Sequence, residues 1–148
     1  MKVVANNKKA NHDYFIENTF ECGIVLKGTE IKSVREGKVA IKDAYCLIRN
    51  NEMFVINMHI SRYDHGNIFN HDETRTRKLL LHKKEIIKIS NKVNQNALAV
   101  VPLKVYIDRG LCKVEIALGK GKKNYDKRQS LKEKDMKRSV EIALKERY

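Results

Sequence analysis

The chain has 148 residues and is strongly basic, with 31 Lys or Arg against 18 Asp or Glu and a formal net charge of +13. Its length and its 42% hydrophobic content fit one globular domain that needs neither disulfides nor a structural metal to fold. No apolar run approaches the 18 residues of a transmembrane helix, and residues 1–9 lack the apolar stretch of a secretory signal. Three widely spaced cysteines (Cys22, Cys46 and Cys112) suit reduced thiols, so we expect a cytoplasmic protein.

The first half of the chain predicts three strands and one short helix. Apolar and polar side chains alternate over residues 14–26, which indicates a long strand with one buried face. Gly23 lies inside that strand and predicts a bend or bulge. A short helix is expected over residues 30–36, followed by strands over residues 39–48 and 53–60.

The second half predicts a long loop, a helix and a hairpin. Residues 61–77 are polar and predict the loop, and the apolar positions of residues 79–93 fit a helix. Residues 100–107 and 111–118 flank a turn and predict two paired strands. The predicted fold is therefore mostly β, an antiparallel OB-like barrel with two or three short helices, because a helix between the third and fourth strands is typical of oligonucleotide-binding barrels. An α+β sandwich remains an alternative.

The positive charge is concentrated at the C-terminal end. Residues 119–148 hold 11 Lys or Arg against 5 Asp or Glu, and they contain few aliphatic side chains before Met136. Such a segment cannot bury enough apolar surface to become ordered alone. We therefore expect an RNA-binding barrel over residues 1–118 and a basic tail over residues 119–148, disordered when free and helical on binding. A terminal helix packed on the barrel is the alternative.

A polyanion is the expected partner of so basic a chain, because neutralising phosphates releases counterions. Arg75, Arg77 and Lys78 place three cations at the start of the predicted helix, where they oppose the helix dipole and suggest a phosphate clamp. The alternative for these three residues is a solvated basic turn. In the tail, Tyr125 stands among glycines and cations, where its ring suits stacking on a nucleobase.

An enzymatic alternative rests on the polar loop, where His65, His71 and Asp72 could hold a metal ion or transfer protons. Their spacing matches no helical His pair, and the sequence has neither a Gly-rich phosphate loop nor a nucleophile elbow. We therefore expect no enzymatic activity, no cofactor and no metal. A metal-dependent RNA-processing enzyme remains the weaker alternative.

Six segments, spread in order along nearly the whole chain, resemble the SsrA-binding protein (small protein B) family of bacteria. They are Asn7-Lys8-Lys9-Ala10, His12-Asp13-Tyr14-Phe15-Ile16, Gly28-Thr29-Glu30-Ile31-Lys32-Ser33, Arg35-Glu36-Gly37-Lys38, Arg75-Thr76-Arg77-Lys78-Leu79-Leu80-Leu81 and Gly121-Lys122-Lys123-Asn124-Tyr125-Asp126-Lys127-Arg128.

This resemblance implies an RNA-binding protein that binds the tRNA-like domain of transfer-messenger RNA (tmRNA) and takes part in trans-translation, the rescue of stalled ribosomes. It implies that the tail enters the decoding region of the small ribosomal subunit and the vacant mRNA channel, where it becomes helical. We expect neither a membrane nor DNA as a partner. A general ribosome-associated RNA-binding module is the alternative from another class.

The resemblance also assigns candidate contacts, most of them inside a matching segment, with Glu21 on the first long predicted strand and Lys113 on the last. The expected RNA contacts of the barrel include these positions and the basic residues near them. They are Asn7, Lys8, Lys9, Glu21, Arg75, Arg77, Lys78, Leu80 and Lys113. The expected contacts with the decoding centre and the mRNA channel are Gly121, Lys122, Lys123, Tyr125, Asp126, Lys127 and Arg128. Physically, a lysine would neutralise a phosphate, a carboxylate would accept from a base amino group, and an exposed leucine would give an unstacked base an apolar surface.

Overall fold

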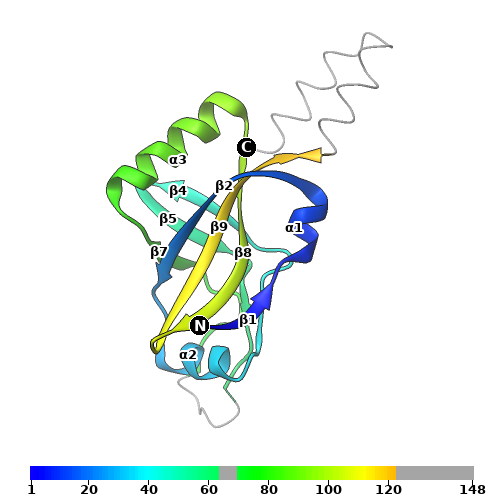
Figure 1. Ribbon diagram of the computed structural model, residues 1–148. Coiled ribbons are helices and arrows are strands. Elements are labelled where there is room, and N and C mark those ends of the chain that lie inside the picture. The colour runs from blue at the N-terminus through cyan, green and yellow to red at the C-terminus, as the bar shows by residue number, and fades with distance from the viewer. Residues whose placement is uncertain (64–69, 123–148) are drawn as a thin grey trace.

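The computed structural model describes residues 1–63 and 70–122, and most of its regular structure is β (Figure 1). The elements in chain order are β1 (Lys2–Asn6), α1 (Lys8–Asp13), β2 (Tyr14–Ile24), α2 (Gly28–Arg35), β3 (Val39–Ala40), β4 (Tyr45–Arg49), β5 (Glu52–Ile56), β6 (His59–Ile60), β7 (Arg77–Leu80), α3 (Lys83–Asn96), β8 (Ala99–Asp108) and β9 (Leu111–Gly121).

Six of these strands form a closed ring in the order β8-β4-β5-β7-β2-β9, and the pairing of β8 with β9 closes it. All pairs in the ring are antiparallel. Strand β1 adds to β8, while β3 and β6 form a separate two-stranded sheet. Helix α3 lies at one end of the ring and α2 at the other (Figure 1). The expected antiparallel OB-like barrel with short helices is confirmed.

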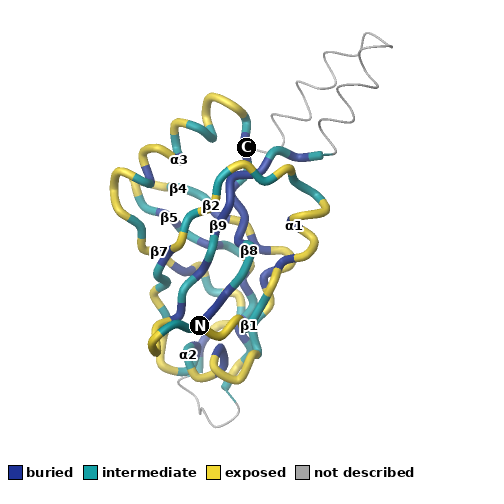
Figure 2. Tube along the Cα trace, in the orientation of Figure 1, coloured by how far each residue is buried: buried dark blue, intermediate teal, exposed yellow. Residues whose placement is uncertain are grey.

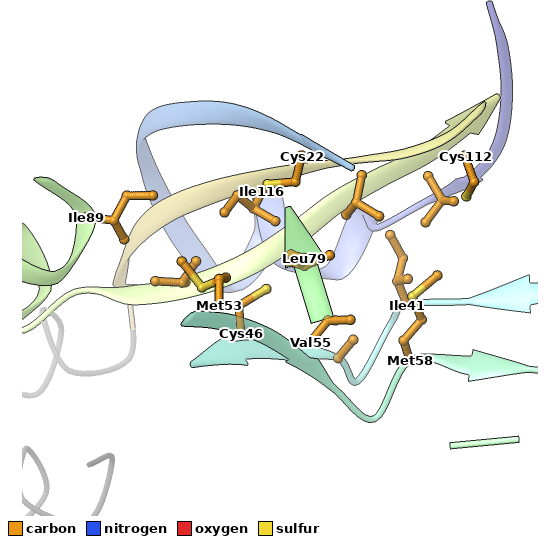
Figure 3. Close-up of a cluster of buried hydrophobic side chains, with 14 of the residues drawn as sticks. Cys22, Ile41, Cys46, Met53, Val55, Met58, Leu79, Ile89, Cys112 and Ile116 are labelled. Atoms are coloured by element: carbon orange, nitrogen blue, oxygen red, sulfur yellow. The ribbon is translucent and has the colours of Figure 1, made fainter. Parts of the chain in front are cut away.

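The interior of the barrel is filled by aliphatic and sulfur-containing side chains (Figure 3). Alternation along β2 and β9 turns Cys22, Val114 and Ile116 inward, where they meet Met53 of β5 and Leu79 of β7. Burying an aliphatic side chain of this size contributes about 1.5–3 kcal/mol, so this shared interior is the main source of stability. Burial follows β8 and β9, while α1 and α3 present exposed faces (Figure 2).

The long strand predicted over residues 14–26 is confirmed as β2, and the predicted C-terminal hairpin as β8 and β9. The irregularity in β2 falls between Ile16 and Asn18, so the bulge expected at Gly23 is not observed. Strand β9 continues to Gly121, beyond the boundary drawn before residue 119. Its last residues, Gly119, Lys120 and Gly121, pair with the start of β2 and therefore belong to the barrel.

The helix predicted over residues 79–93 is wrong at its start. Residues Arg77–Leu80 form strand β7 between β5 and β2, and the helix begins only at Lys83, where the Glu85 carboxylate accepts a hydrogen bond from the backbone of His82. The run of three leucines fits a helical apolar stripe, but Leu79 points into the core and Leu80 points out of the sheet. The two middle strands are shorter than predicted, because each is interrupted before a second short segment begins.

Candidate nucleic-acid interface

Four neighbouring strands, β7, β2, β9 and β8, present one continuous outer face of the barrel (Figure 1). Their register aligns Leu80, Gly23, Lys113 and Tyr106 in a row that crosses all four strands. Each of these positions projects outward, because its neighbours along the strand are buried in the core. We call this the outer row. It brings together Leu80 and Lys113, two residues that are far apart in the sequence.

Glu21 joins the outer row diagonally from the next outward position of β2. Its carboxylate lies 2.8 Å from the Lys113 ammonium, and both groups are at the surface. Hydrogen bonds from Lys113 and, second, from Tyr106 lower the pKa of Glu21. The hydrogen bond to Glu21, in turn, raises the pKa of Lys113. At neutral pH this face therefore presents a fixed carboxylate beside a fixed ammonium group, an acceptor next to a donor.

Tyr106 is the unexpected member of this face. It projects outward yet is only 3% exposed, and it lies between Val3 of β1 and Lys113 of β9 in the sheet. The ammonium group of Lys104 lies 5.9 Å from the ring centroid, and Lys104 also pairs with Glu115 at 3.5 Å. Burial, then the hydrogen bond to Glu21, raises the pKa of the Tyr106 hydroxyl. The hydroxyl therefore stays protonated and donates to Glu21.

At the other end of the outer row, Leu80 is half exposed and rests on β2 beside Gly23. The adjacent Lys78 is also exposed, and its ammonium group lies 2.9 Å from the Glu52 carboxylate. An exposed ion pair of this kind is worth at most about 1 kcal/mol, so Lys78 can exchange its partner for a phosphate at little cost. The predicted contacts Glu21, Leu80 and Lys113 thus lie together on one face, with Lys78 nearby on β7.

Asn7 does not lie on this face. It is 4% exposed and caps α1, since its side-chain oxygen accepts a hydrogen bond from the backbone of Ala10 at 3.0 Å. Its side-chain nitrogen donates to the carbonyls of Ile41 and Pro102 at 3.1 and 2.9 Å. All three bonds are internal, so Asn7 shapes the turn between β1 and α1 and presents no side-chain donor to an RNA.

The cations next to Asn7 are exposed on α1. Lys8 is exposed, and the exposed Lys9 lies 3.4 Å from the carboxylate of Asp43. Gly121 is buried at the end of β9, and the side chain of Lys122 donates to the backbone of α1 at 3.1 Å. The ammonium group of Lys122 lies 5.1 Å from the ring of Phe15. The remaining predicted ribosome contacts, Lys123, Tyr125, Asp126, Lys127 and Arg128, lie outside the described residues.

The phosphate clamp expected at Arg75 and Arg77 needs correction. The Arg77 side chain is fully buried, forms an ion pair with the equally buried Glu30, and donates to the carbonyl of Met58. Arg75 is partly buried and donates to the other oxygen of Glu30 at 2.6 Å. Both guanidinium groups are therefore used to neutralise one buried carboxylate. Because the Arg77 side chain is fully buried, it presents no donor to an external phosphate, so we remove it from the interface.

The polar loop that carried the enzymatic alternative is partly described. His71 is buried; its Nε2 donates to the carbonyl of Ile60 at 2.8 Å, which leaves Nδ1 to accept from the Thr29 hydroxyl at 2.8 Å. Both ring nitrogens therefore have protein partners. Among residues 1–63 and 70–122 no three His, Cys, Asp or Glu side chains gather in a way that could hold a metal ion, and His65 lies outside these ranges. Over the same ranges, none of the helices has the length and hydropathy to span a bilayer.

Sequence reasoning missed Tyr106, and it noted Gly23 only as a bend. The signal for Tyr106 was its place in the alternation of β8, on the outward side between the buried Val105 and the partly buried Ile107. The signal for Gly23 lay in the strand register, which single-sequence periodicity does not contain.

Comparisons with known proteins agree with this architecture. The family model described as "SmpB protein" matches residues 4–146. The "SsrA-binding protein" of Shouchella clausii (strain KSM-K16) is 61% identical, with 99% of this chain and 94% of the relative covered. The "SsrA-binding protein" of Bacillus subtilis (strain 168) is 56% identical, with 98% and 93% covered.

A solved structure described as "tmRNA-SmpB: a journey to the center of the bacterial ribosome" holds a chain of the same fold. The two chains superpose with a TM-score of 0.72 at 42% identity, and the match covers 95% of this chain and 98% of that one. The identity, the coverage and the shared fold extend over both the barrel and its helices. This chain therefore belongs to the SmpB family, the family of the SsrA-binding proteins.

Proposed function

We propose that this chain binds tmRNA at its tRNA-like domain and delivers it to stalled ribosomes in trans-translation. The observation that carries the proposal is membership of the SmpB family together with the likeness to a chain in a tmRNA-SmpB structure. The outer row supports it independently, because residues assigned to RNA contact by resemblance alone, Glu21, Leu80 and Lys113, lie next to one another on the folded barrel.

The barrel supplies chemistry that suits a folded RNA. Lys113 and Lys78 neutralise phosphates, Glu21 accepts from a base N–H, and the exposed Leu80 supports an unstacked base. Lys8 and Lys9 on α1 add cations on another side of the barrel. We place Asn7 and Arg75 in a supporting role, because their polar groups hold the turns that carry α1 and β7.

We further propose that the division of labour follows the predicted domains, a barrel over residues 1–118 that binds tmRNA and a basic tail over residues 119–148 that contacts the ribosome. The proposed contacts with the small-subunit decoding region and the mRNA channel are Gly121, Lys122, Lys123, Tyr125, Asp126, Lys127 and Arg128. This role is one of binding in the cytoplasm, without enzymatic activity, a cofactor or a metal.

A gel-shift series at several salt concentrations tests the proposal. The full chain is expected to prefer the tRNA-like domain of tmRNA over a random RNA of equal length. Its affinity for both should fall as salt rises, with a log–log slope of about −0.7 to −0.9 for each phosphate contact. Equal affinity for the two RNAs would contradict the proposal and favour a general ribosome-associated RNA-binding module. Metal-dependent cleavage of the RNA, lost in His71→Ala, would favour the enzymatic alternative.

A further inference from the structure

A cleft lies at the seam between β4 and β8, away from the outer row. Within the described residues these two strands share a single residue pair, Cys46 with Val100, the shortest pairing in the ring of strands. The cleft has a volume of about 900 Å³ and is bounded by α1, by the start of β4 and by the second half of α3 (Figure 1). Ligand-binding clefts span about 300–1,000 Å³, so this one is far larger than a packing defect.

Apolar side chains form much of the lining of this cleft. They come from three elements and include Leu47 of β4, Val93 of α3 and Val101 of β8. Tyr45, the first residue of β4, lines the same cleft and is 45% exposed. Exposed apolar surface beside a cleft is typical of an interaction site.

The charges in the lining are balanced, although the chain as a whole is strongly basic. Lys9 and Lys42 line the cleft together with Asp13 and Asp43, so their formal charges cancel. Lys9 lies 3.4 Å from Asp43, and both side chains are more than half exposed, so this ion pair exchanges its partners at little cost. A polyanion gains little from a balanced surface, because its binding depends on cations that replace its counterions. The lining therefore fits a protein segment with an apolar stripe and flanking charges better than it fits an RNA.

The tail of the chain begins beside this cleft. Strand β9 ends at Gly121, and the ammonium group of Lys122 donates to the carbonyl of Asn11 in α1 at 3.1 Å. Helix α1 is one wall of the cleft, so the last described residue is held at that wall. Residues 123–135 span up to about 40 Å when extended. The chain beyond them is therefore long enough to reach across α1 into the cleft.

The sequence of the tail carries an apolar stripe that matches the lining. Ser130 and Glu133 have the capping-box spacing that begins a helix. Apolar side chains then recur at helical spacing, which places them on one face of a helix; they are Met136, Val140, Ala143 and Leu144. These positions lie outside the described residues, so the stripe is a pattern of the sequence. A helix this short does not persist alone in water, and it needs an apolar surface of the kind that the cleft offers.

We propose that the apolar stripe of residues 136–144 docks in the cleft between α1, β4 and α3 while the tail has no other partner. The tail, expected to be disordered when free, is then held against the barrel, in line with the packed-helix alternative. Because stripe and cleft belong to one chain, the effective concentration of the stripe is in the millimolar range, and a weak contact suffices. Docking rests on the proposed function, since a ribosome that binds this tail must first displace it from the cleft.

A tryptophan at the cleft tests the docking in the full chain. The sequence contains no Trp, so Tyr45→Trp introduces a single reporter. Its emission should lie at shorter wavelength, and acrylamide should quench it about twofold less, than in the same protein with Val140→Ser and Leu144→Ser, because a millimolar effective concentration docks about half of the tails even when the contact itself is only millimolar. Ile142→Ser is the matched control and should behave like the parent. It makes the same apolar-to-polar change on the opposite side of the predicted helix.

Hydrogen exchange keeps the test decisive if Tyr45→Trp disturbs the fold. With the natural Tyr45, the backbone amides of α1 should exchange more slowly in the wild type and in Ile142→Ser than in the protein with Val140→Ser and Leu144→Ser. Equal quenching and equal exchange in all of these proteins would overturn the docking. Protection that grows with protein concentration would also overturn it, because the tail of a second copy would then occupy the cleft. Protection that appears only after the tRNA-like domain of tmRNA is added would assign the cleft to RNA and overturn it as well.

Failure of the docking is distinguishable from failure of the proposed function. The same proteins are measured for binding to the tRNA-like domain and to a random RNA of equal length. If the reporter does not respond while the chain prefers the tRNA-like domain, the docking fails and the function stands. If the reporter responds as expected while the chain shows no such preference, the function fails and the docking stands.

Discussion

Replacing Glu30 with Gln tests whether Arg75 and Arg77 serve the fold or the RNA. The Glu30 carboxylate is fully buried, and it accepts from both guanidinium groups and from the backbone of Lys27 at 2.8 Å. Glu30→Gln keeps the volume but leaves the buried Arg77 cation uncompensated. Breaking a buried ion pair by removing one partner costs about 3–5 kcal/mol.

For a chain of this length, a loss of that size lowers the midpoint of thermal unfolding by roughly 10 °C. Urea unfolding followed by circular dichroism measures the free energy, with Glu52→Gln as the control. Glu52 pairs with Lys78 at the surface, so its replacement should cost less than about 1 kcal/mol. At low temperature, where the variant is folded, RNA affinity should change less than twofold.

The same carboxylate predicts a pH dependence. Burial alone would raise the pKa of Glu30, but hydrogen bonds from Arg75, the Lys27 backbone and Arg77 outweigh burial and lower it. A carboxylate with a lowered folded pKa stabilises the protein above its unfolded pKa of about 4.3, and this contribution is lost as the pH falls through the folded value. The wild type should therefore lose its advantage over Glu30→Gln in acid. Equal stability of the two proteins at pH 7, or a large gain in RNA affinity from freed guanidinium groups, would refute this reasoning and restore the phosphate clamp.

Three further predictions concern backbone and thiols. Gly119→Ala should destabilise the protein by about 1–3 kcal/mol in thermal unfolding, because its Cβ would lie 2.8 Å from the Cβ of Tyr14; an unchanged midpoint would contradict the close approach. Ala97→Gly should stabilise the protein slightly, by up to about 1 kcal/mol, since Ala97 ends α3 with φ of 53° and glycine adopts this conformation without strain; a loss would refute this. Burial raises the pKa of Cys22 to about 12 and of Cys112 to about 11, so neither thiol should react with iodoacetamide at pH 8 until urea unfolds the chain. Labelling of the folded protein would show that these side chains open to solvent.

Periodicity in the sequence was sufficient for the long elements. The alternation along β2 predicted that strand, and the turn between two apolar segments predicted the β8–β9 hairpin and with it the mostly β fold. Strand β7 was hidden because its inward positions are Arg77 and Leu79. An arginine at a core position reads as a surface residue unless its buried partner, Glu30, is known. Strand β1 and helix α1 were missed because they are only five and six residues long, too short for a clear periodic pattern.

The site was harder to predict than the fold, because its members come from distant strands. Glu21, Leu80 and Lys113 were named from family resemblance, and the register of β7, β2 and β9 then placed them side by side. The cluster of cations that includes Arg75 and Arg77 predicted a phosphate clamp. The sequence could not distinguish a cation that faces RNA from one that neutralises a buried carboxylate. That distinction depends on burial, which is a property of the fold.

The most direct test of the account is removal of the basic tail. A chain that ends at Lys122 keeps β9 and the whole outer row. It is measured against the full chain for binding to the tRNA-like domain and for tagging of peptides on stalled ribosomes. The account predicts that the shortened chain binds this RNA nearly as tightly as the full chain and supports no tagging. Loss of RNA binding on truncation, or tagging that survives it, would contradict the assignment of RNA recognition to the barrel and ribosome contact to the tail.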